Sequence, residues 1–213
     1  MTKIDPEIAE IIDALLPQVP FDGWTMKALR QALLSRGAAP EDAELAFPNG
    51  AGEMIEAFCA LADERMVEAA IAEDLSGLRI PARVRRVIEI RLAQNRGNKE
   101  AIRRALSWLA LPVHGARAVR LTAATVDSIW HAAGDTSADF SWYTKRAILT
   151  AVYTATLLFW LRDTSEDDEA SLQFLDRRLA GVGKIGGLRK KFEGRLKDLG
   201  ARLPGFRRPA PSV

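Results

Sequence analysis

The spacing of apolar residues constrains this chain more than any other feature of its sequence. Apolar side chains recur at intervals of three and four along almost the whole length, which is the spacing of one face of an α-helix. The series that opens the chain is Ile8, Ile11, Ile12, Leu15 and Val19. Convincing runs that alternate between apolar and polar residues, the pattern of half-buried strands, are not evident. The sequence therefore predicts an all-α fold.

Proline, glycine and capping residues mark the ends of the predicted helices. Asp5 and Pro6 begin the first helix, which runs to about Val19, and Thr25 begins a second helix that ends at Gly37. A short acidic segment over 40–47 and a turn over 48–50 follow. The remaining helices are predicted over 53–75, 84–92, 99–109, 116–133, 142–161, 168–179 and 188–199.

These elements group into three units. Residues 1–52 form a helix-turn-helix-like unit, residues 53–180 a helical bundle, and residues 181–213 a hinge, a final amphipathic helix and a tail. The hinge matches the dinucleotide-binding pattern G-x-G-x-x-G from Gly181 to Gly186, but that motif requires a preceding strand in a βαβ unit. Here a predicted helix precedes it, so we interpret the glycines as a flexible connection to the final helix.

The first unit has the layout of a helix-turn-helix, with a support helix, a second helix ended by glycine, a short third segment and a long connector. Bacterial repressors of the TetR type begin in this way. A DNA-reading third helix needs cations for the phosphates. The segment 39–56 instead contains five carboxylates and no Lys or Arg. We therefore expect a retained fold that does not bind nucleic acid, and the alternative is a ligand-responsive TetR-type transcription regulator.

Residues with catalytic or metal-binding chemistry are scarce. The only histidines are His114 and His131, and neither has a Glu three residues earlier, so the paired motif of a di-iron bundle is missing. Cys59 is the only cysteine and cannot build a structural zinc site with two scattered histidines. The sequence predicts no metal site, no catalytic residue and no enzymatic activity.

Compartment signals favour the cell interior. A single cysteine in an apolar run suits a reducing compartment. The first residues carry neither a secretory nor a transit pattern. The most apolar stretch, 147–161, is shorter than the roughly 20 residues that cross a bilayer, so it is predicted to be a core helix.

The final helix is strongly basic. Between Lys184 and Arg208 nine Lys and Arg residues stand against Glu193 and Asp198, an excess of seven positive charges, and since the whole chain carries +2 the remainder sums to −5. An apolar stripe flanked by cations is typical of a helix that lies in the headgroup region of a membrane; packing on the bundle is the alternative. The predicted membrane-binding residues are Leu188, Phe192, Leu196, Leu199, Arg189, Lys190 and Arg195.

Aromatic and charged residues gather over 126–147. Trp142 and Tyr143 fall in the first turn of a predicted helix, and because adjacent helical residues project about 100° apart they cannot both point into one core. Such a pair beside charged residues suits a protein-docking site as well as it suits half-buried packing.

The same region resembles a known family. The stretches IWHAAGDTSADFSWYTKRAIL and VYTATLLFWLRDTSEDDEASLQFLDRRL closely resemble the ubiquinone biosynthesis family that is ninth in the Coq series. The family's runs W-H-x-A-G-D and D-F-x-W-Y-T-x-R-A are present over 130–135 and 139–147. The resemblance extends from about Ile8 to Leu199, weakly before Leu106, and the loop after Pro112 departs from the family's usual sequence.

The resemblance implies a TetR-like fold without DNA binding, usually dimeric, with an apolar pocket for a lipid or polyisoprenoid quinone intermediate and no other cofactor. It implies the di-iron demethoxyubiquinone hydroxylase as partner. The implied partner-binding residues are Asp139, Trp142 and Tyr143, with Arg146 beside them, and we expect Trp130, Val152 and Leu157 to line the lipid pocket. The expected location is peripheral, on the cytoplasmic face of a bacterial inner membrane, or on the matrix side of the mitochondrial inner membrane in a eukaryotic member.

Overall fold

The computed structural model describes residues 3–135 and 141–181, and most of these residues are helical. The all-α prediction is confirmed there, since those residues contain no strand. Short 3-10 turns lie over Leu75–Gly77, Arg96–Asn98, Pro112–His114 and Glu166–Asp168. The helices are α1 (Pro6–Leu15), α2 (Val19–Asp22), α3 (Met26–Ser35), α4 (Asp42–Ala46), α5 (Ala51–Ala72), α6 (Ile80–Gln94), α7 (Lys99–Leu109), α8 (Gly115–Ala132), α9 (Ser141–Trp160) and a last helix over 169–181.

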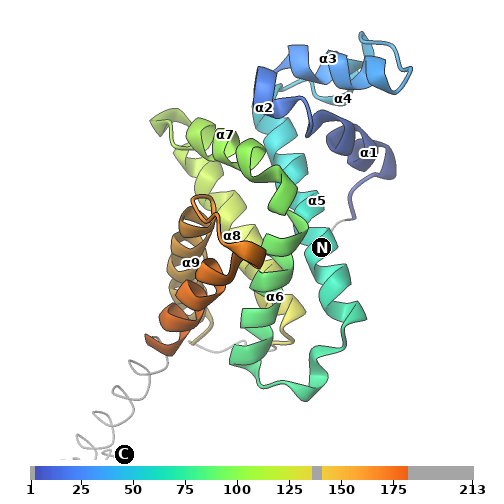
Figure 1. Cartoon of the computed structure of the whole chain (residues 1–213). Coiled ribbons are helices and arrows are strands. Elements are labelled where there is room, and N and C mark those ends of the chain that lie inside the picture. The colour runs from blue at the N-terminus through green and yellow to red at the C-terminus, as the bar shows by residue number, and fades with distance from the viewer. Residues whose placement is uncertain (1–2, 136–140, 182–213) are drawn as a thin grey trace, which may run out of the picture.

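The long helix α5 connects the two ends of the molecule. Figure 1 shows α1–α4 gathered around the first turns of α5, while α6, α8, α9 and the helix over 169–181 lie toward its other end. One continuous hydrophobic core runs through both parts. Its largest fully buried side chains include Ile12 and Leu29 in the first unit and Ile129, Trp160 and Leu175 in the bundle.

The first helix is shorter than predicted. We expected it to run to Val19, but α1 ends at Leu15 and Val19 begins the separate short helix α2. Pro17 has no backbone N–H, so the hydrogen-bond ladder of α1 cannot continue through it, while Pro20 lies in the first turn of α2, where a missing N–H costs nothing. The expected start is correct, because the Asp5 side chain accepts a hydrogen bond of 2.8 Å from the Glu7 N–H and caps α1.

Helix α6 begins four residues earlier than predicted. Pro81 lies in its first turn, where a missing N–H costs nothing, so the helix begins at Ile80 rather than at Val84. The preceding loop is closed by Arg83, whose guanidinium donates to the carbonyls of Leu78 at 2.8 Å and Ser76 at 2.7 Å.

Helix α4 occupies the place of the third helix in the helix-turn-helix layout. Its residues Asp42 and Glu44 are exposed, Glu44 forms an ion pair with Arg30 of α3, and Leu45 is 81% exposed. Carboxylates on this surface repel a phosphate backbone.

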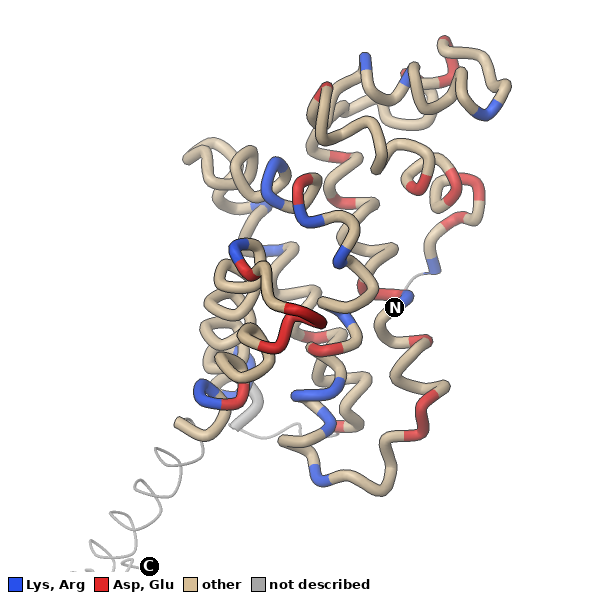
Figure 2. The backbone as a smooth tube through the Cα atoms, in the orientation of Figure 1, with Lys and Arg blue, Asp and Glu red and all other residues tan. Residues whose placement is uncertain are grey.

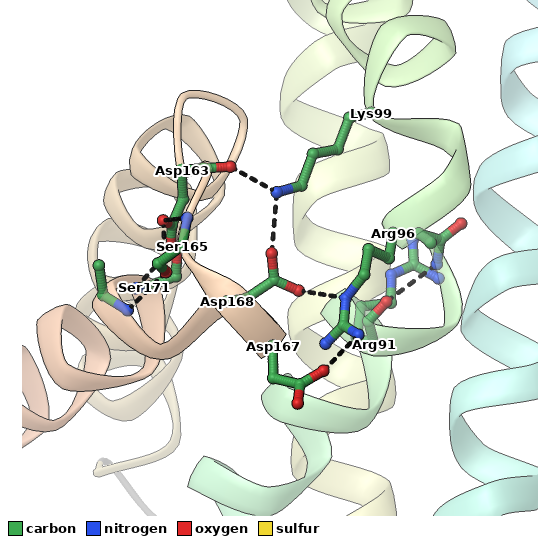
Figure 3. A network of polar contacts seen from close by, with 10 residues as sticks. Arg91, Arg96, Lys99, Asp163, Ser165, Asp167, Asp168 and Ser171 are labelled. Carbon is green, nitrogen blue, oxygen red and sulfur yellow. Dashed lines mark hydrogen bonds and ion pairs between the residues drawn. The ribbon is translucent and has the colours of Figure 1, made fainter.

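A polar network fixes the last helix to the bundle (Figure 3). Asp168 accepts from Arg96 Nε and from Lys99 Nζ, each at 2.8 Å, and Lys99 also donates to the Asp163 carbonyl at 2.9 Å. Asp167 and Asp168 both have left-handed backbone angles, with φ of 51° and 59°, a conformation that costs an L-residue about 1 kcal/mol or more. These ion pairs hold that turn in place, so the helix over 169–181 starts at a defined position.

The Asp163 carboxylate organises the start of this helix. It accepts from the backbone N–H of Ser165 and of Ser171, both at 2.8 Å, and from both hydroxyl groups. Partial burial raises the pKa of Asp163, but these hydrogen bonds outweigh burial and lower the pKa to about 2.

The lowered pKa predicts a loss of stability in acid. A carboxyl group whose pKa is lower in the folded state stabilises the fold above its unfolded pKa of about 4, and this contribution disappears as the pH falls toward 2. We expect Asp163→Ala to lower the free energy of unfolding by about 1 kcal/mol at pH 6, allowing for solvent screening. Urea unfolding should show this difference narrowing at pH 3.5, and an equal difference at both pH values would contradict the assignment.

Candidate functional site

An apolar cavity lies inside the bundle between α5, α6, α7, α8 and α9. Its volume is about 80 Å³. Most of its wall consists of aliphatic and aromatic side chains, and Trp160 at the end of α9 is fully buried against it. The apolar lining includes Phe58, Ile102, Leu106, Leu109, Leu121 and Leu157.

One end of the cavity is polar. Arg91 of α6 lines it, and the Arg91 Nη1 atom lies 3.0 Å from Oδ1 of Asp63 on α5. Thr125 of α8 donates from its hydroxyl to the other Asp63 oxygen at 3.0 Å, and Tyr153 of α9 lies beside Arg91 and contributes to raising its pKa. Asn95 donates to the Arg91 carbonyl at 2.9 Å. All five residues are buried, so four helices supply one polar cluster inside an apolar core.

Burial and charge act against each other in this cluster. Burial raises the pKa of Asp63, while Arg91 and Thr125 lower it less. Burial by itself would lower the pKa of Arg91, but the neighbouring Asp63 and Tyr153 outweigh it and raise the pKa, so the guanidinium is charged. Burial also raises the pKa of the Cys59 thiol to about 12, so this side chain is a neutral thiol at pH 7.

A wider groove opens on the surface between α7, α9 and the helix over 169–181. Its volume is about 1060 Å³. The Phe159 and Phe174 rings stack in it with centroids 4.6 Å apart, and the Arg178 guanidinium lies 4.8 Å from the Phe174 centroid. Arg162 and Arg103, which pairs with Glu100, also line the groove, together with one carboxylate, Asp163. In Figure 2 basic residues stand out on α6, on α7 and near the end of the described part of the last helix.

Leu106 of α7 separates the cavity from the groove, because its side chain lines both. The helix over 169–181 contributes Phe174 and Arg178 to the groove, so the network around Asp168 fixes one wall of it. The cavity and groove together form the candidate site, with a charged inner end, an apolar middle and a basic outer edge.

The predicted lipid-pocket residues divide between two cavities. Leu157 lines the cavity beside Arg91, whereas Trp130 and Val152 line a second cavity of about 210 Å³ between α6, α8, α9 and Leu179. In that second cavity Lys145 Nζ lies 5.7 Å from the Trp130 ring centroid. The structure therefore brings Trp130 and Val152 together and places Leu157 at a different site.

The predicted partner-binding residues lie at the start of α9 or just before it. Tyr143 is 73% exposed, and Arg146 forms an ion pair with Asp127 of α8. Trp142 belongs to the first turn of α9, and Asp139 lies outside the described residues. The exposure of Tyr143 makes this end of α9 accessible to another protein.

The predicted membrane-binding helix lies outside the described residues. All seven of its predicted contact residues fall there, so they stay a prediction from sequence. Within the described part of the chain, none of the helices has the length and apolar character needed to span a bilayer. Those residues also contain no cluster of three or more His, Cys, Asp or Glu side chains suited to a metal ion.

Sequence reasoning missed the polar end of the cavity. Arg91 lies three residues after Ile88 and four after Val87, on the buried face of α6. Asp63 lies three residues before Met66 and four before Val67, on the buried face of α5. The sequence signal for this cluster is a charged residue on the apolar face of an amphipathic helix. Its role depends on which opposite charge lies next to it in the folded protein.

The fold defines a TetR-like helical protein. A TetR transcriptional regulator from Nitrosomonas europaea superposes with a TM-score of 0.68 at 25% sequence identity, covering 83% of this chain and 97% of the regulator. The predicted fold family is therefore confirmed. The similarity concerns architecture and does not favour the regulator alternative.

Sequence comparison identifies the family. The COQ9 family model matches residues 115–186. The mitochondrial ubiquinone biosynthesis protein coq9 of Schizosaccharomyces pombe is 30% identical over 191 residues, covering 88% of this chain and 74% of that protein, and human mitochondrial COQ9 is 32% identical over 184 residues, covering 83% and 57%. The chain belongs to the COQ9 family of ubiquinone biosynthesis proteins, as the resemblance predicted. It spans 58% of the length of COQ9-A from Xenopus laevis.

The buried ion pair predicts a clear pattern of stability. Arg91→Met leaves the Asp63 carboxylate buried without its partner and should lower the free energy of unfolding by about 3–5 kcal/mol. The double variant Asp63→Leu with Arg91→Met removes both charges. Its free energy of unfolding should be at most about 1 kcal/mol below that of the wild type, or should exceed it. Urea unfolding of the three proteins measures this, and a double variant as unstable as the single one would contradict the pairing.

Proposed function

We propose that this protein is a non-catalytic lipid-binding accessory protein of ubiquinone biosynthesis. It holds a polyisoprenoid quinone intermediate and presents it to the di-iron demethoxyubiquinone hydroxylase at a membrane surface. The observation that carries the proposal is the cavity and adjoining groove, in a chain that belongs to the COQ9 family. Mostly apolar concave sites with a few placed polar groups are typical ligand sites.

The shape of the site suits a long apolar ligand with a polar end. The floor of the groove is apolar where Leu106, Leu158 and Phe159 line it, and such side chains would shield an isoprenoid tail from water. Tail burial contributes roughly 25 cal/mol per Å² of apolar surface. The arginines at the groove suit an anionic or oxygen-rich surface next to the ligand, as at a phospholipid headgroup layer.

The start of α9 is the proposed docking site for the hydroxylase. Tyr143 offers a large exposed ring, and Arg146 and Asp127 provide opposite charges close by. Exposed aromatic residues with charged neighbours are typical anchors of protein interfaces. Trp142 and Asp139 belong to the same proposed surface on sequence grounds.

We further propose a homodimer and a peripheral membrane location. Ala147, Ala151 and Thr154 recur at intervals of four and three on the exposed side of α9, and small side chains allow close approach of a second helix. The basic helix over 188–199 would hold the bundle on anionic lipid. Its place would be the cytoplasmic face of the inner membrane in a bacterium, or the matrix side of the mitochondrial inner membrane in a eukaryote; several relatives are named mitochondrial.

The docking proposal predicts the effect of a charge at α9. Tyr143→Lys should reduce co-purification with the hydroxylase at least tenfold, because a lysine removes the anchor ring and places a new cation in the interface. Leu45→Lys, at a residue 81% exposed on α4, is the matched control and should co-purify normally. Circular dichroism should be unchanged in both variants. Equal recovery of the hydroxylase with Tyr143→Lys and with wild type would refute this docking site.

The membrane proposal predicts binding to anionic vesicles. Each basic residue near an anionic surface contributes about 1 kcal/mol, so reversing Arg189, Lys190 and Arg195 to Glu should weaken binding to phosphatidylserine vesicles more than tenfold. Reversal of Lys27, Arg30 and Arg36 in the first unit changes the net charge equally and should have little effect. Vesicle flotation at 0.1 M salt measures both. Equal losses in the two triple variants would mean that net charge, rather than the final helix, governs binding.

A further inference from the structure

The Arg91–Asp63 pair has properties that a purely structural ion pair does not need. Arg91 is 7% exposed and Asp63 is 5% exposed, so both charges have lost almost all contact with bulk water. A buried ion pair is rarely more stabilising than apolar side chains of the same volume, because desolvation of the charges offsets their attraction. Stability alone therefore gives little reason for a guanidinium at this position.

The pair is also incompletely hydrogen-bonded. Arg91 Nη1 and Asp63 Oδ1 are 3.0 Å apart, yet among the described residues neither atom has a hydrogen-bond partner of acceptable geometry. The second Asp63 oxygen is satisfied by Thr125. Buried polar groups in folded proteins are nearly always hydrogen-bonded, so the Arg91 guanidinium, which lines the cavity and is held to Asp63 without good hydrogen-bond geometry, can take an additional acceptor.

The chemistry of the cluster defines what it can recognise. A guanidinium has only donors, so the missing group must be an acceptor such as a carbonyl, phenolic or ether oxygen. Asp63 already balances the Arg91 charge, so a neutral ligand fits better than an anion. The rest of the wall, including Phe58, Ile102 and Leu121, suits an apolar ring.

We propose that Arg91, oriented by Asp63 and Tyr153, binds the ring oxygen of a prenylated quinone or phenol, and that the prenyl tail passes Leu106 into the groove. This inference rests on the proposed lipid-binding function and adds the headgroup, its orientation and the residue that recognises it. A neutral acceptor oxygen at Arg91 gives the guanidinium a hydrogen-bond partner, while a hydrocarbon at the same place would not.

The size of the cavity requires Leu106 to move. A cavity of about 150 Å³ holds benzene, whereas this one measures about 80 Å³. Leu106 is partly buried and forms the wall toward the groove of about 1060 Å³. In this proposal, displacement of the Leu106 side chain opens the cavity toward the groove, and the ring enters toward Arg91 while the tail stays in the groove.

The test compares two probes on the full-length protein. The first is a ubiquinone with two isoprene units, and the second is an acyclic isoprenoid hydrocarbon of the same tail length without the ring. The protein variant is the charge-free double substitution Asp63→Leu with Arg91→Met, whose fold is checked by urea unfolding. We expect the affinity of the variant for the quinone to fall by about 10- to 100-fold, because a hydrogen bond to a charged group contributes that much to binding. Its affinity for the hydrocarbon should stay within about twofold of the wild-type affinity.

The outcomes separate this inference from the proposed function. A wild type that binds both probes equally, or a variant that loses both in parallel, would overturn recognition by Arg91 and leave lipid binding intact. Failure of the wild type to bind either probe would overturn both proposals.

A second variant tests the passage at Leu106. Leu106→Ala widens it and should raise the association rate of the quinone several-fold, while Leu106→Trp should lower it. Stopped-flow binding with rates unaffected by either substitution would overturn the passage.

Discussion

The buried contact between Asp63 and Arg91 lies where four helices of the bundle meet. Asp63 belongs to α5 and Arg91 to α6, while Thr125 of α8 and Tyr153 of α9 complete the cluster around them. Because a buried charge is costly unless it meets its partner, these four helices can pack in only a narrow range of registers. The helices that form this polar cluster also line the apolar cavity next to it, so the packing that pairs the charges also shapes the site.

The last described helix completes the site from outside. Its start is fixed by Asp168 between Arg96 and Lys99, and by the Asp163 carboxylate that caps its first turn. Phe174 then stacks on Phe159 and closes one side of the groove. The same helix leads directly toward the basic segment after residue 181. Ligand groove and proposed membrane contact are therefore neighbours along the chain, which suits a protein that exchanges a lipid with a bilayer.

The first unit keeps the helix-turn-helix layout and is acidic at the position of the third helix. Helix α4 exposes carboxylates and Leu45 where a DNA reader needs cations. The unit nevertheless supports the bundle, since Trp24 donates from Nε1 to the Ala101 carbonyl at 3.0 Å and Arg104 donates to the Pro20 carbonyl at 2.7 Å. These contacts reach α7, the helix that carries Leu106, so the unit has a structural role in positioning the site.

The sequence by itself determined the helical class and most helix boundaries, because the spacing of apolar residues, the capping residues and the prolines affect only a few neighbouring residues. It also determined the family, through the motifs over 130–147. The Asp5 cap of α1 follows from such a local pattern. The break between α1 and α2 also had a local cause in Pro17. Only the tertiary structure decided that Arg91 meets Asp63, that Leu157 and Trp130 line different cavities, and that Leu106 separates cavity from groove. Those relations join residues far apart in the chain, and they depend on the register in which helices pack, which no local pattern encodes.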